Sequence, residues 1–520
     1  MASTRPALDR PRDRIPALTP LVFLSGAAAL VYEVLWARQL ATLLGTSSHA
    51  QALVVAAYMA GLALGARALG PLADRVRRPF LLIAALESGI AAYAIAGTWL
   101  LPSLGPAWAG AAAGLGSGAA AQLARFALAL AVLLPPTILM GATLPALVRA
   151  TAADRESAGH AAGRIYGANT LGAAAGALLA GYALLPALGV RGSTLAAAGV
   201  QALVAVAFVA LGSRLGDTDK RAQPNAAAAA RTATGGTPSG ASRPARRGDR
   251  DRSSAGGEPS GMPLPRAPRG GVLVLFAATG FLALAAQMAW VRALTLVIGS
   301  SVYAFAATLA VYLLGLGTGA ALAAWALQRS RRAIDASRAV WLLVVLELGM
   351  AASILLGLPA LRALPPIFLA GWEAGANGSF VLLQLLWLLL AAIVMLVPTA
   401  LSGALLPAVV AACSGGADRL GRDTGAVYAA NTSGTVLGAP VAALALLPAL
   451  GVARTLVVLG IAHAVLALGF ATIARGLGGS PAFRRSRRLL WLGAAVALLL
   501  ALAAGRWDRR LMTSGPYINA

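Results

Sequence analysis

The stretch Pro136-Thr-Ile-Leu-Met-Gly-Ala-Thr-Leu-Pro145 occurs a second time, with few changes, as Pro398-Thr-Ala-Leu-Ser-Gly-Ala-Leu-Leu-Pro407. The two copies are offset by 262 residues (398 − 136). Further identities follow at the same offset: Tyr166, Asn169, Thr170, Gly172, Gly176, Pro186 and Gly189 match Tyr428, Asn431, Thr432, Gly434, Gly438, Pro448 and Gly451. So many identities in the same order indicate a duplicated structural unit.

The duplication extends toward the N-terminus, where residues 26–75 match residues 280–329 at an offset of 254 (280 − 26). The matched residues are Gly26, Trp36, Arg38, Gly45, Ser47, Tyr58, Gly61, Gly65 and Arg75 in the first copy and Gly280, Trp290, Arg292, Gly299, Ser301, Tyr312, Gly315, Gly319 and Arg329 in the second. The chain therefore consists of two similar halves.

The composition identifies the solvent of these halves as lipid. Hydrophobic residues make up 59% of the chain and charged residues 12%, against roughly 45–50% and 25% in soluble domains. The net charge of +24 comes from arginines that stand in short clusters between apolar runs. This distribution is typical of the cytoplasmic loops of membrane proteins, and it argues against a nucleic-acid-binding protein.

Thirteen windows have the length and apolar character of a membrane-spanning helix, which needs about 20 residues. They lie near 18–42, 49–72, 80–102, 120–148, 161–187, 191–213, 271–298, 302–327, 338–360, 378–411, 424–449, 453–474 and 487–505. Residues 106–118 have the length of a short interfacial helix. We therefore expect an all-α integral membrane protein with six helices in each half and one more at the C-terminal end.

The segments outside the spans complete the expected domain plan. Residues 1–17 form an N-terminal tail, 18–214 the first membrane repeat, 271–476 the second and 506–520 a C-terminal stub. Residues 215–270 are rich in Gly, Pro, Ser, Ala and Arg and have almost no large apolar side chains. Such a segment buries too little surface to offset its ordering entropy, so it predicts a disordered basic linker.

Arginine placement predicts the orientation in the membrane. With the N-terminus inside, the inner loops hold most of the arginines and the outer connections hold little besides Arg191, Arg362 and Arg454. Because Lys and Arg are enriched on the cytoplasmic side, we expect a multi-pass protein of the inner (plasma) membrane with a cytoplasmic N-terminus. Thirteen spans would then put residues 506–520 outside the cell.

Six spans per repeat give both halves the same orientation, which relates them by an axis along the membrane normal. This plan resembles that of the major facilitator transporters. The stretch Gly70-Pro-Leu-Ala-Asp-Arg-Val-Arg-Arg78 also resembles the signature of that superfamily, with Gly70, Asp74, Arg75 and Arg78 in the loop between the second and third spans. In the second half Gln328 takes the place of the acid, and an ordinary basic inner loop explains the stretch equally well.

Three stretches resemble the membrane part of bacterial fused major facilitator/spermidine synthase proteins. They are Ser25-Gly-Ala-Ala-Ala-Leu-Val-Tyr-Glu-Val-Leu-Trp-Ala-Arg38, Leu139-Met-Gly-Ala-Thr-Leu-Pro145 and Gly163-Arg-Ile-Tyr-Gly-Ala-Asn-Thr-Leu-Gly172. In that family a Rossmann-like aminopropyltransferase domain follows, which implies decarboxylated S-adenosylmethionine and a polyamine as its ligands. The tail from Arg506 to Tyr517 resembles the start of that domain.

No glycine-rich strand-to-helix loop with a downstream acid follows this tail. None of the family's catalytic residues therefore has a matching position here, and we expect no cofactor in this chain. Cys413 is the only cysteine and the three histidines are scattered, so the sequence has neither an intrachain disulfide nor the spacing of a metal site.

An ionisable side chain inside a membrane needs a partner, a water-filled cavity or a function. Glu33 and Arg38 lie in the first span, Arg125 lies in the fourth, and Arg292 repeats Arg38. One interpretation is a structural ion pair of Glu33 with Arg125 or Arg38. The other makes Glu33 a binding site for an ammonium group or a proton, which would be asymmetric because Gln287 is its repeat equivalent.

Glu87 and Glu347 are a matched pair of acids in the third and ninth spans. One interpretation has them face a central cavity and hold the ends of a polyamine or a similar cation. In the other, each acid bonds a neighbouring helix and fixes its packing. Asn169 and Asn431 are further polar candidates for a binding site, although hydrogen bonding between helices also explains them.

Four Gly-xxx-Gly motifs begin at Gly61, Gly172, Gly315 and Gly434. Their spacing lets helices approach closely in lipid, so we expect packing and no nucleotide binding. Three hypotheses for function remain: the membrane module of a spermidine synthase-like protein that anchors or feeds an aminopropyltransferase, a proton-coupled transporter of a small organic solute, and a non-transporting scaffold.

Overall fold

The structure, a computed structural model, describes residues 11–44, 48–112, 114, 118–233, 268–329 and 336–477. Within these residues it has one long helix for each of the first twelve expected spans. Their bounds are α1 Pro11–Leu44, α2 Ser48–Arg75, α3 Pro79–Ala112, α4 Ala119–Thr151, α5 Arg155–Leu179, α6 Leu185–Ala233, α7 Arg269–Ile298, α8 Val302–Arg329, α9 Ala336–Glu373, α10 Phe380–Cys413, α11 Leu420–Val441 and α12 Leu447–Gly476. The prediction of an all-α membrane protein is confirmed.

Short helical turns complete the described chain. A π-helical turn follows α5 at η1 (Ala180–Leu184) and follows α11 at η4 (Ala442–Leu446), and 3₁₀ turns lie at η2 (Ala376–Gly378) and η3 (Ala417–Arg419). The two π turns stand at the same offset of 262 (442 − 180) as the sequence repeat. The duplication therefore extends to irregularities of the backbone.

Two glycines reverse the chain between neighbouring spans. Gly189 has φ 63° and ψ −175°, and Gly451 has φ 72° and ψ 172°. This backbone conformation is essentially restricted to glycine, because a Cβ would clash there. Ten stretches of the described chain are long and apolar enough to cross a membrane. Two of them, Arg155–Arg214 and Ala417–Gly476, are each divided by one of these glycines into two spans.

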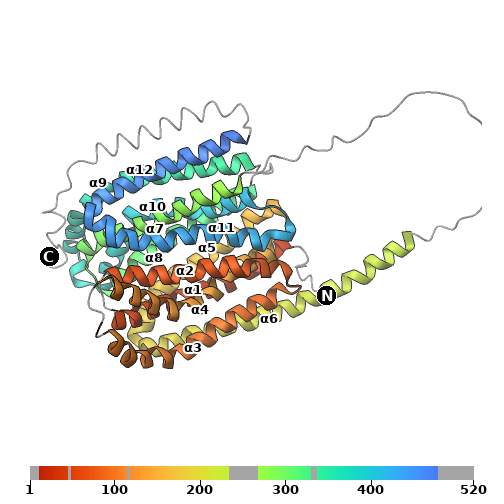
Figure 1. Cartoon of the computed structure of the whole chain (residues 1–520), viewed down its shortest axis with the longest axis horizontal. Helices are drawn as coiled ribbons and strands as arrows, with labels where there is room; N and C mark the ends of the chain where they lie inside the picture. Colours follow the sequence, from red (N-terminus) through yellow and green to blue (C-terminus); the bar gives the residue numbers. More distant parts are fainter. Residues whose placement is uncertain are drawn as a thin grey trace, which may run out of the picture.

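Several expected segments differ from the structure or lie outside it. The expected helix at 487–505, the stub 506–520 and most of the N-terminal tail are outside the described residues. The linker was expected from residue 215, but α6 continues to Ala233 and extends beyond the bundle (Figure 1). The physical reason is the run Ala226–Ala230, because alanine has the highest helix propensity. The expected interfacial helix at 106–118 is largely the last part of α3.

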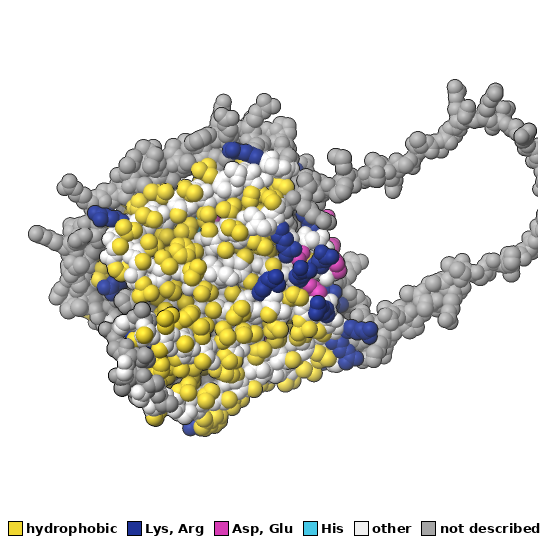
Figure 2. Space-filling view, viewed as in Figure 1, with side chains coloured by type: hydrophobic (Ala, Val, Ile, Leu, Met, Phe, Trp, Pro, Cys, Tyr) yellow, Lys and Arg dark blue, Asp and Glu magenta, His cyan; other side chains and the backbone are white. Residues whose placement is uncertain are grey.

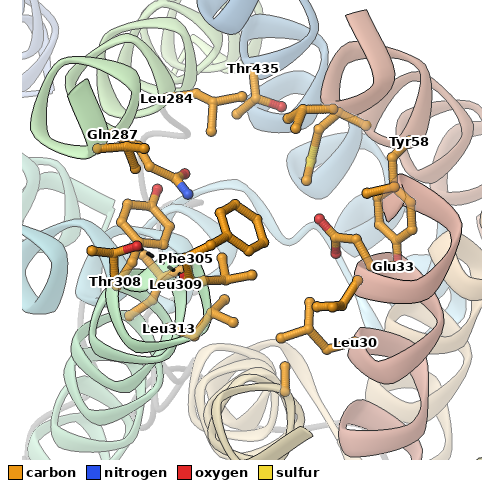
Figure 3. A pocket seen from close by; sticks show the side chains of 18 of the residues that line it. Leu30, Glu33, Tyr58, Leu284, Gln287, Phe305, Thr308, Leu309, Leu313 and Thr435 are labelled. Atoms are coloured by element: carbon orange, nitrogen blue, oxygen red, sulfur yellow. Dashed lines mark hydrogen bonds between the residues drawn. The ribbon is translucent and has the colours of Figure 1, made fainter. Parts of the chain in front are cut away.

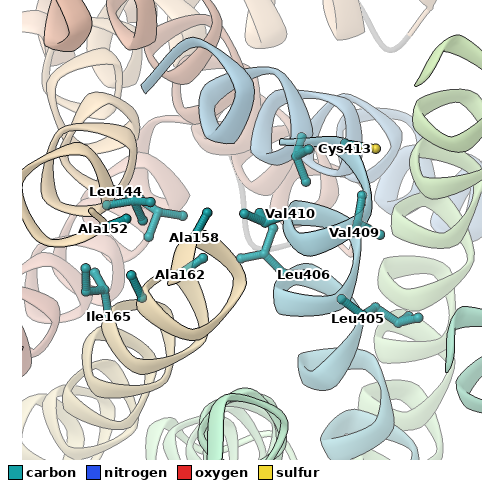
Figure 4. Packing of buried hydrophobic residues seen from close by; sticks show 14 of the residues in the cluster. Leu144, Ala152, Ala158, Ala162, Ile165, Leu405, Leu406, Val409, Val410 and Cys413 are labelled. Atoms are coloured by element: carbon teal, nitrogen blue, oxygen red, sulfur yellow. The ribbon is translucent and has the colours of Figure 1, made fainter. Parts of the chain in front are cut away.

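The helices form two bundles that lie side by side, α1–α6 in one and α7–α12 in the other (Figure 1). Across the boundary between them, α2 packs along α11 and α5 packs along α8 and α10. Figure 4 shows part of this boundary, where Ala158 and Ala162 of α5 face Leu406 and Val410 of α10. Small residues on one helix pack against branched residues on the other in this part of the boundary.

The Gly-xxx-Gly motifs hold helices together within each half, as expected. A Cβ on Gly65 of α2 would overlap the Ile138 carbonyl oxygen of α4, and a Cβ on Gly319 of α8 would overlap that of Ala400 in α10. The motifs of α5 and α11 make the matching contacts with α1 and α7. Only glycine permits this close approach of two backbones.

Charge separates the two ends of the molecule. The loops after α2, α4, α8 and α10 lie at one end, and Figure 2 shows Lys and Arg side chains gathered there beside acidic ones. We call it the arginine-rich end; its arginines include Arg75, Arg77, Arg78, Arg149, Arg155, Arg269, Arg329, Arg419 and Arg422. The opposite, arginine-poor end holds Arg191, Arg362 and Arg454. Hydrophobic side chains cover the face between the two ends (Figure 2).

Candidate functional site: a central cavity between the halves

A cavity of about 940 Å³ lies between the two bundles. Its lining comes from helices of both halves, mainly α1, α2, α4 and α5 on one side and α7, α8, α11 and the start of α12 on the other. Figure 3 shows a largely apolar wall that includes Leu30, Leu284, Leu309 and Leu313. This volume is in the range of small-molecule binding sites.

The cavity reaches the arginine-poor end of the molecule. Its lining there includes Leu44 at the end of α1, Gln51 near the start of α2 and residues 299–302 between α7 and α8. Toward the other end the lining finishes at buried residues such as Leu147 and Leu406. The cavity therefore opens toward the arginine-poor end and is closed toward the arginine-rich end.

Asp74 closes the arginine-rich end by joining the two halves. Its carboxylate accepts hydrogen bonds from the backbone N–H groups of Gly421 and Arg422, each at 2.8 Å, and it lies 3.5 Å from the Arg149 guanidinium. Gly70, one turn earlier in α2, packs directly on the backbone of Gly421. These contacts lie at the start of α11, where unpaired N–H groups favour an anion.

The rest of the signature loop points away from this contact. Arg75 and Arg78 are exposed at the arginine-rich end. On the opposite side of the boundary, where Gln328 takes the place of an acid, α5 and α8 are joined by His160, whose Nδ1 lies 3.0 Å from the Ala324 carbonyl oxygen. The two sides of the closed end are therefore held differently.

Repeat-related residues line the two walls of the cavity. The matched polar pairs are Tyr58 with Tyr312, Tyr166 with Tyr428, Asn169 with Asn431, Thr170 with Thr432 and Arg38 with Arg292. Tyr166 and Tyr428 meet across the boundary, with ring centroids 6.4 Å apart in an edge-to-face arrangement. Sequence reasoning missed the four tyrosines, although their repeat offsets were visible.

One charged position breaks this symmetry. Glu33 projects into the cavity from α1, and Gln287, its repeat equivalent in α7, projects toward it from the opposite wall (Figure 3). Glu33 has no hydrogen bond or ion pair with any residue in the described part of the chain. It is also the only carboxylate among the described residues that line the cavity. This carboxylate is free to take a proton or a solute.

The expected ion pairs of Glu33 are not formed. Arg38 and Arg292 line the same cavity with exposed side chains, and Arg125 in α4 does not belong to the lining. In the described ranges, none of the three makes an ion pair with an acid. For Arg38 the reason is the geometry of α1, because five residues place its backbone about 7.5 Å from that of Glu33 along the helix axis.

Glu87 does not face the cavity, contrary to one of the two interpretations above. It is fully buried inside the first half, where the Ser25 hydroxyl of α1 donates to both of its carboxylate oxygens at 2.9 and 3.1 Å. The Gln201 amide of α6 donates a further hydrogen bond. The carboxylate thus connects α1, α3 and α6, as the packing interpretation requires.

Glu347 occupies the corresponding position inside the second half and is also fully buried. It accepts a hydrogen bond from the Thr279 hydroxyl of α7, and its Oε2 lies 2.7 Å from Nδ1 of His463 in α12. Thr279 matches Ser25 at an offset of 254, and His463 matches Gln201 at an offset of 262. Sequence reasoning missed these partners because only the acids had been compared.

The two asparagines lie at the edge of the cavity, where both can reach a solute. Asn431 also donates from Nδ2 to the Phe276 carbonyl oxygen at 3.2 Å, which ties α11 to α7. Asn169 packs with its backbone against Gly26 of α1. Within the described residues no group of three or more His, Cys, Asp or Glu side chains is placed to bind a metal ion.

Comparison with solved structures identifies the fold. The human organic anion transporter MFSD10 (TETRAN) superposes with a TM-score of 0.50 at 14% identity, covering 88% of this chain and 99% of that one. The E. coli fucose:proton symporter gives 0.49 at 14% identity, covering 90% and 98%. A second structure of that symporter, a Major Facilitator Superfamily transporter in the outward conformation, gives 0.43 at 16% identity, covering 90% and 99%.

The likeness to the MFSD10 structure shows that this chain shares its fold, and the twelve described helices form two six-helix bundles, as the sequence repeat predicted. No protein-family model matches the sequence, and comparison with curated proteins gives no match. The structural likeness carries no support for the resemblance to fused spermidine synthases. At 14% identity it also says nothing about substrate.

Proposed function

We propose that this protein is a secondary transporter that moves a small organic solute across the membrane in exchange with, or together with, a proton carried by Glu33. The observation that carries the proposal is the unpartnered Glu33 carboxylate in a cavity between two repeat-related bundles. The other two acids inside the membrane, Glu87 and Glu347, are satisfied within their own halves. Among the acids in the described helices, only Glu33 combines membrane depth with access to a solute.

In this proposal the arginine-rich end faces the cytoplasm of a bacterial cell and the cavity opens outward. Arginine enrichment on the cytoplasmic side supports that orientation. The solute enters between α1 and α7, and the bundles then rock about it while the contact of Asp74 with α11 breaks. Protonation of Glu33 removes a charge that is costly to carry through a closed, desolvated state.

The test is transport by the full chain in proteoliposomes that contain a pH-sensitive dye. A panel of small organic anions, cations and neutral solutes, including spermidine, is scanned for solute-dependent proton movement. For any solute that responds, Glu33→Gln is expected to retain solute exchange and to lose stimulation by a pH gradient. Glu87→Gln is the matched control, because it alters a buried acid that does not line the cavity.

The outcome that contradicts the proposal is gradient-driven uptake by Glu33→Gln at the wild-type rate. Glu33→Asp separates charge from shape: a coupling carboxylate keeps part of its rate as Asp and loses coupling as Gln, whereas a purely steric role is filled better by Gln, which has the size of Glu, than by the shorter Asp. Folding of each variant is checked by its thermal unfolding midpoint.

A second proposal comes from the sequence resemblance, in which the chain is the membrane module of a spermidine synthase-like protein and binds a polyamine. Its support is the three resembling stretches. In the structure their residues pack helices and line the cavity, as Gly172 and Asn169 do, so the fold explains them without an enzyme. Spermidine-dependent flux in the panel, or retention of an aminopropyltransferase during purification from the source cell, would favour this proposal over the first.

A further inference from the structure

Two arginines occupy equivalent positions on opposite walls of the central cavity. Arg38 lies six residues before the end of α1 at Leu44, and Arg292 lies six residues before the end of α7 at Ile298. Six residues of helix correspond to about 9 Å, so the backbone of both arginines lies inside the mouth of the cavity. Both side chains are exposed, and the surface that exposes them is the cavity wall.

Neither arginine makes an ion pair within the described residues. An arginine at membrane depth that has no acid beside it is costly unless water or a ligand meets it. A structural arginine would be expected to find a carboxylate, as Arg269 does with Asp423 at 2.6 Å. Arg38 and Arg292 remain available to a ligand instead.

The charges of the described lining residues favour one class of ligand. With Glu33 ionised, the lining carries two positive charges and one negative charge, and with Glu33 protonated it carries two positive charges alone. Building on the proposed function, we infer that the transported solute is a small organic anion whose carboxylate, sulfonate or phosphate group is held between Arg38 and Arg292. The planar guanidinium suits these groups because it donates two parallel hydrogen bonds.

The remainder of the solute meets a different surface. Glu33 and Gln287 lie five residues deeper than the arginines on their helices, about 7.5 Å farther into the cavity. Figure 3 shows the apolar side chains of Leu30, Leu284 and Phe305 around these two polar side chains. An apolar or aromatic body is therefore the expected partner of the anionic group.

The charge of Glu33 determines whether the solute and the proton move in the same direction or in opposite directions. An ionised Glu33 repels an anion in the same cavity, and a protonated Glu33 does not. Proton binding therefore strengthens anion binding, and by thermodynamic linkage the anion strengthens proton binding to the same extent. This arrangement moves the anion and the proton in the same direction.

The test measures the charge preference of the cavity directly and needs no known substrate. Ala41→Cys and Thr295→Cys are repeat-related reporters, each one turn beyond an arginine on the cavity lining. Each is made in the full chain with the single native cysteine replaced, Cys413→Ala. Two thiosulfonate reagents, one bearing a sulfonate and one a trimethylammonium group, are compared by their rates of modification, each divided by its rate with free cysteine.

We expect both reporter cysteines to react about fivefold faster with the sulfonate reagent than with the trimethylammonium reagent, after the correction for free cysteine. This is the size of effect expected for the interaction of unit charges a few ångströms apart in water. Arg38→Gln with Arg292→Gln is expected to reduce the ratio to about one, and each single variant to an intermediate value. Replacement by Lys retains the charge and keeps the ratio. Arg191→Gln is the control, because Arg191 lies at the same end but stacks on Trp99 beside a different pocket.

A ratio of one or below with both arginines present overturns the inference, as does a sulfonate preference that survives their removal. If the double variant does not fold, the single variants and their Lys counterparts decide. These readings are independent of flux. A sulfonate preference without proton-coupled transport would support an anion-binding cavity and contradict the transporter proposal. Proton-coupled transport with an ammonium preference would keep the transporter proposal and contradict only the inference that the solute is an anion.

Discussion

The two halves of the molecule hold their helices together in the same way but carry different charges. Gly172 packs on the Phe23 carbonyl of α1, and its repeat equivalent Gly434 packs on the Ala277 carbonyl of α7. The cavity, by contrast, has Glu33 on one wall and Gln287 on the other. Packing imposes the same requirement on both halves, so a position where they differ in charge has to be explained by something other than packing.

The same comparison applies to the buried acids and to the closed end. Glu87 is bonded by a hydroxyl and an amide, whereas Glu347 is bonded by a hydroxyl and His463. Asp74 ties α2 to α11, and no acid stands at its repeat position. Where the two halves have different residues, we expect matched substitutions to change stability or transport unequally. Where their residues are identical, we expect equal changes.

The largest effect is expected at the close helix contacts. Gly172→Val and Gly434→Val should each destabilise the protein by about 3 kcal/mol or more, because the new side chain overlaps backbone of a neighbouring helix. Thermal unfolding in detergent measures the loss. Gly199→Val is the control, since a Cβ there meets nothing within 4 Å. Tolerance of valine in one half alone would break the symmetry of packing.

The buried acids should respond unequally. Glu347→Gln is expected to cost about 2 kcal/mol, because it disturbs the short contact of the carboxylate with His463 at 2.7 Å, where both side chains are fully buried. Glu87→Gln should cost less than about 1 kcal/mol, since its partners are a neutral hydroxyl and a neutral amide. Denaturant or thermal unfolding compares the two variants. Equal losses would show that the histidine adds nothing to the second cluster.

A smaller effect is expected at the arginine-rich end. Asp74→Asn keeps one acceptor but loses the charge that binds the start of α11, a change of about 1.5 kcal/mol. The ratio of open to closed states at this end should rise about tenfold. Spin labels on Arg78→Cys and Arg329→Cys report the distance between the halves. Asp418→Asn is the control, because Asp418 is exposed and, within the described residues, its ion pair is with its neighbour Arg419. An unchanged distance distribution in Asp74→Asn would contradict the role of Asp74 in closing this end.

The smallest difference concerns the two asparagines. Asn431→Ala should cost about 0.6 kcal/mol through loss of its bond to the Phe276 carbonyl, and Asn169→Ala should cost less. Unfolding measurements on the pair test this order. A reversed order would mean that Asn169 has the stronger packing role.

The fold could be predicted from the sequence because its signals are local or repeated. Apolar runs of span length predict thirteen helices, of which the first twelve are present in the described residues, and the offsets of 254 and 262 predict two parallel halves. The glycine pairs correctly indicated helix packing, because close approach in lipid requires small residues wherever it occurs. The end of α6 was missed because composition alone does not separate a helix of alanines from a linker.

The site was predicted only in part, because spacing along a helix does not say which way a side chain faces relative to the other half. Glu33 lines the cavity, as one of its two interpretations requires, whereas Glu87 and Glu347 lie buried inside their own halves and not on the cavity wall. Their partners Gln201 and His463 lie on α6 and α12, more than 110 residues away in the chain. Only the three-dimensional packing of α1, α3 and α6 brings such residues together.

The measurement that tests the central claim most directly moves the acid from one wall to the other. Uptake driven by a pH gradient is compared in the wild type, in Glu33→Gln and in the double variant Glu33→Gln with Gln287→Glu. Because the two positions face each other across one cavity, we predict that the gradient has no effect on Glu33→Gln and that the double variant recovers part of the response. Undiminished gradient-driven uptake by Glu33→Gln would contradict the claim that this carboxylate carries the proton.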